Sequence, residues 1–374
     1  MIIKTDLSDK EKHLRIRKQG TLQTLTQFPL KVNWSLTDMC NYSCSYCFGQ
    51  LPIDRNRFSS LDQLRKAVSH IADANRDYYE FTITGGEPTV HPHLVDLLQM
   101  IYETLGSRLD NIVVISNGSQ SVQYYSRIAE IPRNRNMLLA FSVHPAYMSK
   151  EHLTELVKGL SVRVPIFFTL MMDPDQMDKV RMLHQTLTEL RAEYPFEMRT
   201  VILREPPDFD RADSRYSQSS YEWRRKSEDI FSAAAENSVY SFEWNVRHPL
   251  SWYYEIEEEQ ETRVIREYDP DQYLISGMHA FRNMYCISGV SVLRISPSGK
   301  ATGIVCDVEG SEYNIFYENP LEMKEWIHKV HCPYRNCCCE TNHRVPKFSE
   351  SEEAEQFVEE YKSRQEERLS RHSY

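Results

Sequence analysis

The sequence predicts an α/β fold, a partial (β/α)6 barrel of the TIM type followed by a small cysteine-rich extension that contains a β-hairpin. Between residues 30 and 204, apolar runs typical of strands alternate six times with helix signals, which indicates a parallel sheet. Six units fit this length, because a full eight-unit barrel normally needs about 250 residues. The nine cysteines fall into two groups, three at residues 40–47 and six at residues 286–339, and this division sets the extension apart from the barrel.

Breaks in the periodic pattern divide the chain into five predicted segments. Residues 1–29 are polar and charged, and Pro206-Pro207 interrupts the regular alternation. The residues from Ser349 onwards carry the charged, amphipathic pattern of a terminal helix. The segments are an N-terminal lead-in (1–29), the barrel core (30–204), a connecting and pocket-shaping region (205–280), the cysteine-rich extension (281–345) and the C-terminal helix (346–374).

Each element of the predicted barrel has its own sequence signal. The apolar run from Val32 to Leu36 predicts the first strand, and Ser60 with Gln63 forms a capping box that opens the first helix. The continuous apolar run from Ile112 to Ile115 is typical of a strand buried on both faces. The predicted strands cover residues 32–36, 81–84, 112–115, 138–143, 164–171 and 198–203, and the helices begin near residues 60, 93, 122, 149, 177 and 221. In such a barrel the active site lies at the C-terminal ends of the strands.

Composition and charge describe an ordinary globular protein and disfavour two classes of partner. Hydrophobic residues make up 41% of the 374 residues, and charged residues make up 26%. The formal net charge of −10 disfavours a nucleic-acid partner, because a phosphate-binding surface is rich in Lys and Arg. The first residues lack a signal-peptide pattern, and no apolar run approaches the roughly 20 residues of a membrane span. We therefore expect a cytoplasmic protein with neither a nucleic-acid nor a membrane partner.

Three thiols directly follow the first predicted strand. Cys40, Cys44 and Cys47 lie in a loop of polar residues, which can bring three sulfur atoms toward one point. Three thiolates complete neither a tetrahedral zinc site nor the four-cysteine set of a common iron–sulfur cluster. If they hold a four-iron cluster, one iron has no protein ligand and is open to a bound molecule. A disulfide plus a spare thiol is the alternative, which the signal-free chain disfavours because disulfides are rare in reducing compartments.

Polar motifs also follow the second, third and fourth predicted strands. Gly85-Gly86-Glu87-Pro88 combines two glycines, which let the backbone approach a ligand, with a carboxylate that can bind an amine. A plain tight turn is the alternative for this motif. Ser116 and Asn117 follow the third strand, where an Asn-Gly turn is the alternative. Ser142 and His144 share one face of the fourth strand because side chains alternate along a strand, and a structural histidine is the alternative there.

The three-cysteine loop and the Gly-Gly-Glu-Pro motif together resemble the two signatures of the radical S-adenosylmethionine (SAM) superfamily. The resemblance covers residues 32–204. It implies that Cys40, Cys44 and Cys47 hold a [4Fe-4S] cluster whose open iron takes the amino and carboxylate groups of SAM. It also implies that Gly85 and Gly86 bind the amino group of SAM. The full set of implied SAM contacts, with Tyr46 beside the adenine, is Tyr46, Gly85, Gly86, Glu87, Pro88, Ser116, Asn117, Ser142 and His144.

The same resemblance implies a radical reaction. One electron from a flavodoxin- or ferredoxin-type donor breaks the sulfonium C–S bond of SAM and gives methionine and a 5′-deoxyadenosyl radical. That radical removes a hydrogen atom from an unactivated carbon of the substrate, a step that acid–base side chains do not perform. The expected substrate is a peptide, a protein or a biosynthetic small molecule.

The second cysteine group begins at a predicted hairpin. Apolar runs at residues 290–295 and 301–305 flank a tight turn, and the hairpin is expected to bring Cys286 and Cys306 together at its open end. With the cysteine-rich stretch at residues 332–339, this region resembles a twitch or shortened SPASM extension, which holds an auxiliary [4Fe-4S] cluster. The expected ligands are Cys286, Cys306, Cys332 and either Cys337 or Cys339. Zinc in the same four thiolates, as a structural brace, is the alternative.

Two other functions stay open at this stage. The stretches around the first loop and around Ser116-Asn117-Gly118 are also similar to viperin-like, nucleotide-modifying members of the superfamily, with Arg204 and Arg282 as candidates for binding a triphosphate. A non-enzymatic iron–sulfur or zinc scaffold, or a redox sensor, is expected to bind iron without cleaving SAM. We expect a radical SAM enzyme of the oxidoreductase or maturase type, with the auxiliary cluster accepting an electron.

Overall fold

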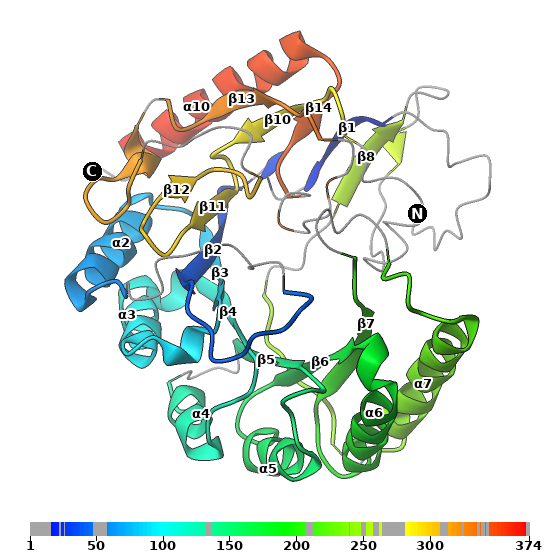
Figure 1. Cartoon of the computed structure of the whole chain (residues 1–374). Helices are drawn as coiled ribbons and strands as arrows, with labels where there is room; N and C mark the ends of the chain where they lie inside the picture. The colour runs from blue at the N-terminus through cyan, green and yellow to red at the C-terminus, as the bar shows by residue number, and fades with distance from the viewer. Residues whose placement is uncertain are drawn as a thin grey trace.

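Figure 1 shows the computed structural model of the chain, in which two sheets organise the elements. The larger sheet has eight strands and is mostly parallel, and the smaller one has six strands and is antiparallel in its pairings. Within the described part of the chain, none of the helices combines the length and the apolar character that a membrane span requires. The structure describes residues 16–21, 24–25, 27–47, 58–131, 136–205, 212–238, 240–247, 252–256, 262–263, 281–306, 313–323, 325–334, 337, 341 and 344–371.

The eight-stranded sheet has the strand order β12-β11-β2-β3-β4-β5-β6-β7. Every neighbouring pair from β11 to β7 is parallel, and only the short β12 is antiparallel to its neighbour. The six consecutive parallel strands β2 to β7 confirm the predicted strand alternation of the α/β core. The strands are β2 (Pro29–Thr37), β3 (Tyr78–Gly85), β4 (Leu109–Ser116), β5 (Met137–Val143), β6 (Ile166–Met172), β7 (Glu197–Ile202), β11 (Val292–Ile295) and β12 (Ala301–Thr302).

Helices cover the convex face of this curved sheet (Figure 1). Each helix buries one apolar stripe; in the first, Leu64, Val68 and Ile71 are buried at helical spacing. The predicted capping box is present there, since Gln63 N donates to Ser60 Oγ (3.3 Å) and Ser60 N donates to Gln63 Oε1 (2.9 Å). The helices are α2 (Leu61–Asp73), α3 (Leu94–Leu105), α4 (Val122–Ala129), α5 (Lys150–Leu160), α6 (Met177–Arg191) and α7 (Gln218–Glu236).

The main hydrophobic core fills the space between the sheet and these helices. Strand side chains alternate between this core and the concave face of the sheet. In β6, for example, Phe168 and Leu170 are buried, whereas Phe167, Thr169 and Met171 are only half-buried. The concave face is therefore the side on which residues are accessible to a ligand.

The second sheet joins segments that are remote in the sequence. Its strand order is β13-β10-β14-β1-β8-β9, so strands from the predicted lead-in and connecting region pair with strands of the predicted extension. The long helix α10 (Ser351–Arg371) packs on it (Figure 1). The strands are β1 (Ile16–Thr21), β8 (Trp252–Ile256), β9 (Thr262–Arg263), β10 (Tyr285–Ser288), β13 (His328–His331) and β14 (Lys347–Phe348).

The predicted hairpin is present as β11 and β12, but its place differs from the expectation of a separate extension. β11 pairs in parallel with β2, so the hairpin extends the barrel sheet by two strands. Lys31 N donates to Ser291 O (2.8 Å) at the start of this pairing. Val292, Leu293 and Ile295 are all fully buried. A strand that is apolar on both faces needs cover on both: Leu293 and Ile295 join the main core, and Val292 joins a second apolar cluster that also contains Cys286 and Cys332.

Candidate active site

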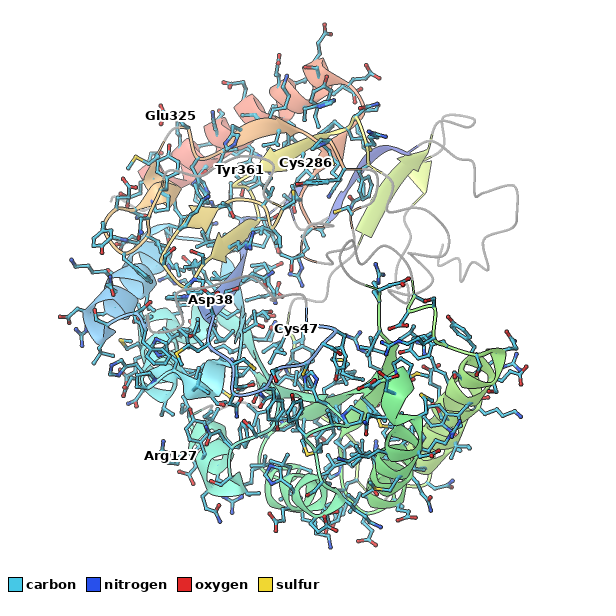
Figure 2. All side chains as sticks on the ribbon, in the orientation of Figure 1. Asp38, Cys47, Arg127, Cys286, Glu325 and Tyr361 are labelled. Atoms are coloured by element: carbon cyan, nitrogen blue, oxygen red, sulfur yellow. The ribbon has the colours of Figure 1, made fainter. Side chains whose placement is uncertain are left out.

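The loop that follows β2 carries three thiols. Cys40 and Cys47 are exposed, Cys44 is half-buried, and none of the three forms a disulfide bond. Cys47 N donates a backbone hydrogen bond to Cys44 O (3.2 Å), which curls the end of the loop. Figure 2 labels Cys47, which lies on the concave side of the barrel sheet. The loop therefore stands where the C-terminal ends of the strands meet.

The three sulfur atoms match the donor set of an iron–sulfur cluster with one open iron. Burial raises the pKa of the Cys44 thiol to about 11 and also raises the pKa of Cys40, so both are protonated near neutral pH. Cluster binding requires thiolates and therefore releases these protons. Among the described residues, no group of three or more His, Cys, Asp and Glu side chains is arranged around a single metal ion. The fit to an iron–sulfur cluster thus rests on the three sulfur donors and on two glycines beside the loop, Gly85 and Gly86, which form a cradle for it.

Gly85 and Gly86 form this cradle at the end of β3. Gly86 N donates to Thr37 O (2.7 Å) and Glu87 N donates to Met39 O (2.7 Å), which fixes the start of the cysteine loop. A Cβ atom on Gly85 would lie 2.2 Å from Thr37 O, and one on Gly86 would lie 2.3 Å from Met39 O. Gly85 also has a φ of 147°, which other residues rarely adopt. Glycine is therefore required at both positions for this close approach.

The carboxylate of Glu87 is buried and is already bound by the protein. Its Oε1 accepts hydrogen bonds from Thr89 N (3.0 Å) and Ser116 Oγ (2.9 Å), and its Oε2 accepts one from Asn117 N (2.6 Å). Burial raises the pKa of Glu87 despite these three donors. Glu87 thus ties the end of β3 to the end of β4, and Pro88 begins the 3-10 turn that follows.

Ser116 and Asn117 bring the end of β4 to the cysteine loop. The buried Ser116 Oγ lies 2.7 Å from Tyr125 Oη, within hydrogen-bonding distance. Asn117 Nδ2 donates to Asn41 Oδ1 (2.8 Å) and lies 3.8 Å from Cys40 Sγ. In this structure both side chains therefore organise the wall of the site. Their contacts with SAM stay predictions.

Ser142 and His144 lie half-buried at the end of β5, both on the concave side as strand alternation predicts. His144 Nδ1 lies 3.0 Å from Tyr46 Oη and 3.4 Å from Cys44 Sγ. Burial lowers the pKa of His144 to about 4, so its imidazole is neutral near neutral pH. The Tyr46 ring lies nearly parallel to that of His144, with ring centroids 5.8 Å apart. The structure thus brings a predicted strand-end histidine directly to the cysteine loop.

Sequence reasoning missed two tyrosines of this site. The rings of Tyr42 and Tyr147 stack with centroids 4.1 Å apart and an interplanar angle of 10°. Tyr147 Oη also accepts a hydrogen bond from Ser43 N (3.2 Å), so this side chain fastens the cysteine loop to the segment after β5. The available signal was the position of Tyr147 only three residues beyond the strand-end residue His144.

The later cysteines gather in a second apolar cluster. Cys286 in β10 and Cys332 after β13 are buried in it, and Cys306 and Cys337 pack against it. A hydrogen bond between the first two raises the pKa of Cys286 and lowers the pKa of Cys332. Cys339, the other predicted ligand, lies outside the described residues. Figure 2 labels Cys286 in the smaller sheet, apart from the three-thiol loop.

A buried lysine next to this second cluster was also missed. Lys347 in β14 is the cross-strand neighbour of Cys286. Its Nζ donates to Val345 O (2.9 Å) and lies 4.9 Å from the centroid of the Phe281 ring. Its positive charge partly offsets the rise in the pKa of Cys286 and adds to the lowering of the pKa of Cys332. Only strand pairing brings these positions together, so no local sequence signal points to them.

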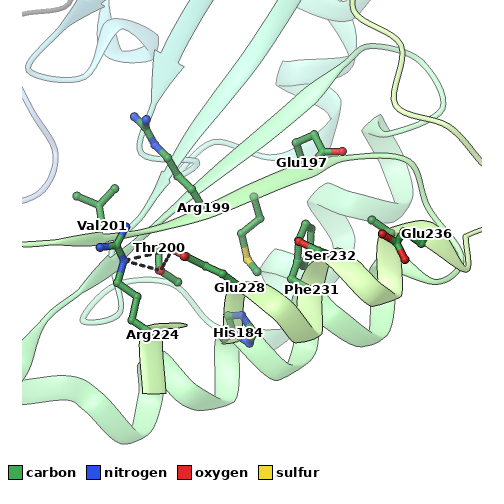
Figure 3. Close-up of a pocket in the computed structure, with 12 residues that line it drawn as sticks. His184, Glu197, Arg199, Thr200, Val201, Arg224, Glu228, Phe231, Ser232 and Glu236 are labelled. Atoms are coloured by element: carbon green, nitrogen blue, oxygen red, sulfur yellow. Dashed lines mark hydrogen bonds and ion pairs between the residues drawn. The ribbon is translucent and has the colours of Figure 1, made fainter. Parts of the chain in front are cut away.

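A separate cavity of about 450 Å³ lies beside β7 (Figure 3). Residues of β7 and α7 line it, and inside it Arg224 Nε lies 3.2 Å from Glu228 Oε1. Thr200 Oγ1 donates to the same carboxylate (3.2 Å). The predicted triphosphate-binding candidates Arg204 and Arg282 are half-buried and exposed, respectively, and neither lines this cavity. Two of its charged side chains, Arg224 and Glu228, are therefore paired with each other, and Arg199 of β7 also lines the cavity.

Comparison with known families identifies the domain that carries the three thiols. Residues 34–160 match the model of the Radical SAM superfamily. This range includes the cysteine loop, the glycine cradle and the ends of β4 and β5. Residues 34–160 form a radical SAM domain. The predicted superfamily is therefore confirmed for this part of the chain, and the superfamily uses a [4Fe-4S] cluster and SAM.

Two relatives of the radical SAM domain are enzymes named GTP 3′,8-cyclase. The one from Actinobacillus succinogenes is 34% identical over 92 residues, which are 24% of this chain and 26% of the relative. The one from Mannheimia succiniciproducens is 31% identical over 109 residues, which are 28% of this chain and 31% of the relative. The similarity therefore spans about a quarter to a third of these relatives.

Solved structures with a similar arrangement include two proteins bound to S-adenosylmethionine. Native anSMEcpe with bound AdoMet and Cp18Cys peptide has a TM-score of 0.49 and 14% identity, covering 89% of this chain and 96% of that one. Streptococcus suis SuiB bound to S-adenosylmethionine has a TM-score of 0.48 and 14% identity, covering 79% and 65%.

Proposed function

We propose that this chain is a radical SAM enzyme that cleaves SAM reductively to a 5′-deoxyadenosyl radical and uses it to abstract hydrogen from a peptide, a protein or a biosynthetic small molecule. The observation that carries the proposal is a loop of three cysteines inside a radical SAM domain. The bound cluster and SAM supply the reductive cleavage, and a flavodoxin- or ferredoxin-type protein supplies the electron.

The residues of the chain hold and orient these groups. Cys40, Cys44 and Cys47 provide the thiolates. Gly85 and Gly86 let the end of β3 pack directly against the start of the cysteine loop, and their backbone would bind the methionine end of SAM. The neutral imidazole of His144, in contact with Cys44, keeps the loop close to the end of β5.

For the second cysteine group we propose an auxiliary [4Fe-4S] cluster held by Cys286, Cys306, Cys332 and either Cys337 or Cys339. Support comes from the four described cysteines, which share one apolar cluster, and from the positive charge of Lys347 beside them. Zinc in the same site is the competing proposal. Anaerobic reconstitution followed by iron and sulfide quantitation separates the two: about eight irons per chain support two four-iron clusters, whereas about four irons plus one zinc contradict the auxiliary cluster.

Modification of a nucleotide is the second candidate function. It is favoured by the names of the relatives, which describe enzymes that act on GTP. Incubation of the reconstituted protein with SAM, a reductant and single nucleoside triphosphates tests it. A triphosphate that increases 5′-deoxyadenosine release at least severalfold supports this candidate, and no stimulation by any of them counts against it.

The central experiment measures 5′-deoxyadenosine from reconstituted protein, dithionite and SAM by liquid chromatography and mass spectrometry. We expect release by the wild-type chain and only background release by Cys44→Ala, because a three-cysteine site does not tolerate the loss of one ligand. Cys332→Ala is the matched control, since it removes a thiol from the other group and is expected to retain SAM cleavage. Iron-loaded wild-type protein that releases no 5′-deoxyadenosine would contradict the proposal and favour a scaffold or redox sensor.

A further inference from the structure

We propose that the concave side of β5, β6 and β7 binds an oxyanion of the substrate, a carboxylate or a phosphate, through Arg199 with Thr169 and Ser142 beside it. This inference rests on the proposed function and deepens it by naming a chemical class of substrate. The radical SAM motifs of this chain assign no role to β6 and β7, and on this row they assign one only to Ser142 in β5.

Strand register places the three side chains in one row. Ser142 in β5 is the direct partner of Thr169 in β6, and Thr169 is the direct partner of Arg199 in β7. Because neighbouring strands lie about 4.8 Å apart, the row spans roughly 10 Å. The chain neighbours of these residues, Phe141, Phe168 and Thr200, are buried toward the helices. Because side chains alternate along a strand, Ser142, Thr169 and Arg199 project to the concave side. A hydroxyl, a second hydroxyl and a guanidinium therefore stand side by side.

The three side chains of the row form no polar contact with other described residues. No hydrogen bond joins the side chain of Ser142 or Thr169 to another described residue, and Arg199 makes no ion pair with one. The nearest carboxylate on the same face of β7, Glu197, lies 3.5 Å from Arg191 Nη2 instead. Figure 3 shows Arg199 pointing away from α7, opposite to Thr200 and Glu228. An exposed arginine on a concave face that forms no ion pair with any described residue is suited to an anion from outside the chain.

The Arg199 side chain is also held in place. Its guanidinium carbon lies 5.7 Å from the centroid of the Phe167 ring, which projects from the same face of β6. A cation stacked on an aromatic ring keeps its planar N–H groups free for hydrogen bonds in that plane. Arginine binds carboxylate and phosphate through two parallel N–H···O bonds, and the neighbouring hydroxyls can donate to a remaining oxygen.

The position of the row suits a substrate rather than SAM. The features assigned to the cluster and SAM stand at the C-terminal ends of β2, β3 and β4. These three strands are neighbours in the sheet and form one side of its concave face. Arg199 is on β7, at the other end of the sheet. His144, two residues beyond Ser142 on the same face, touches Cys44 Sγ at 3.4 Å. A substrate whose oxyanion is bound at Arg199 can therefore extend along the row toward the cysteine loop, where the radical would form.

Calorimetric titration of the full-length protein with inorganic phosphate and, separately, with acetate at constant ionic strength tests the inference. We expect saturable binding of one of these anions to the wild-type chain and weakening by at least about tenfold in Arg199→Gln, because a charge-assisted bidentate contact is lost. Thr169→Val should weaken binding severalfold, which keeps the test informative if the first variant folds poorly. Arg225→Gln, an exposed arginine on α7, is the matched control and should bind like wild type.

Two results would overturn the inference. The first is wild-type protein that binds neither anion saturably, or Arg199→Gln that binds as tightly as wild type. The second is loss of SAM affinity in reconstituted Arg199→Gln, which would assign the row to the carboxylate of SAM. Anion binding is measured without SAM chemistry, so a failure of SAM cleavage by the wild-type chain would count against the proposed function and not against the oxyanion site.

Discussion

Asn117 connects the cysteine loop to the barrel through both its backbone and its side chain. Its N–H donates to Glu87 Oε2 (2.6 Å), its Nδ2 donates to Asn41 Oδ1 (2.8 Å), and its Oδ1 accepts from Ser119 N (3.0 Å). Because these groups polarise one another, the loss of one partner is expected to loosen the others. At the residue scale, Asn117 thus links the cysteine loop to the ends of β3 and β4.

Glu87→Gln tests this network. The glutamine oxygen can still accept from Thr89 and Ser116, but its NH₂ group then faces the N–H of Asn117 and leaves a buried donor without an acceptor. We expect a loss of about 1–3 kcal/mol in the free energy of unfolding, measured with urea, together with reduced SAM cleavage. Glu130→Gln, at an exposed carboxylate after α4, should change neither quantity. Equal stability of Glu87→Gln and wild type would contradict the bracing role of Glu87.

His91 predicts a specific loss of stability in acid. Its Nδ1 accepts from His93 N (3.1 Å), and its Nε2 is buried without a hydrogen-bond partner in the described structure. Burial, and to a smaller extent the charge of His93, lowers the pKa of His91 from 6.5 to about 4. The unfolded chain therefore takes up the proton first. The stability due to neutral His91 is complete above pH 6.5 and is lost as the pH falls from 6.5 to 4.

The size of this effect is about 3 kcal/mol at the acid end, from about 1.4 kcal/mol per pKa unit. Urea unfolding of wild type and His91→Asn at pH 7, 5.5 and 4.5 measures it. The asparagine oxygen can replace Nδ1 as the acceptor for His93 N, and asparagine does not titrate. The stability difference between the two proteins should shrink steadily as the pH falls. A difference that is constant over this range would contradict the assignment.

At the scale of elements, the end of β3 acts as a cradle for the loop after β2. Two backbone hydrogen bonds of 2.7 Å join these segments, from Gly86 N to Thr37 O and from Glu87 N to Met39 O. The parallel pairing of β2 with β3 continues directly into this contact, from Pro29 opposite Tyr78 to Thr37 opposite Gly85. The loop position is therefore an extension of sheet geometry.

Gly86→Ala should separate site geometry from overall folding. The new Cβ would lie 2.3 Å from Met39 O, so the start of the cysteine loop must move. We expect the iron content after reconstitution and the rate of SAM cleavage to fall at least about tenfold, because small displacements at a site have large effects on rate. Gly106→Ala is the control for backbone strain, because no described atom lies within 4 Å of its Cβ position; its φ of 51° should cost about 1–3 kcal/mol of stability and leave iron loading unchanged. Normal iron loading in Gly86→Ala would contradict the cradle.

At the scale of the whole molecule, α10 fastens the smaller sheet to the N-terminal edge of the barrel. Arg76, between α2 and β3, is almost fully buried, and its Nη1 donates to Tyr361 Oη (2.8 Å) and to Val290 O (3.2 Å). Tyr361 Oη in turn donates to Val290 O (3.1 Å). Three segments far apart in the sequence thus meet at one arginine. Its Nε and Nη2 have no hydrogen-bond partner within the described structure, so the remaining bonds matter more.

Tyr361→Phe removes the hydroxyl from this junction and leaves the buried guanidinium with one acceptor fewer. We expect a loss of about 1–3 kcal/mol in the free energy of unfolding, seen as a lower urea midpoint. Tyr317→Phe, at a tyrosine that is 70% exposed, is the matched control and should be neutral. The same midpoint for Tyr361→Phe and wild type would show that the junction does not stabilise the assembly of the two sheets.

The sequence alone was sufficient for features that depend on local periodicity and on motif chemistry. Burial on one helix face or on alternate strand positions leaves a repeat in the chain, and this repeat predicted β2 to β7 and the capping box at Ser60. The three-cysteine loop and the Gly85-Gly86 pair were equally readable, because few residue types can provide metal ligands or a close backbone approach. The superfamily followed from these motifs and is confirmed over residues 34–160.

Only the tertiary structure decided which remote segments become neighbours. It placed β11 beside β2, paired β1 with β8 and β14, set Lys347 opposite Cys286, and aligned Ser142, Thr169 and Arg199 in one row. Strand pairing is made by backbone hydrogen bonds that are the same for almost every residue type, so it leaves little trace in the side chains. The chemistry of the three thiols was therefore encoded locally, whereas the groups that surround them on the concave face came from register and topology.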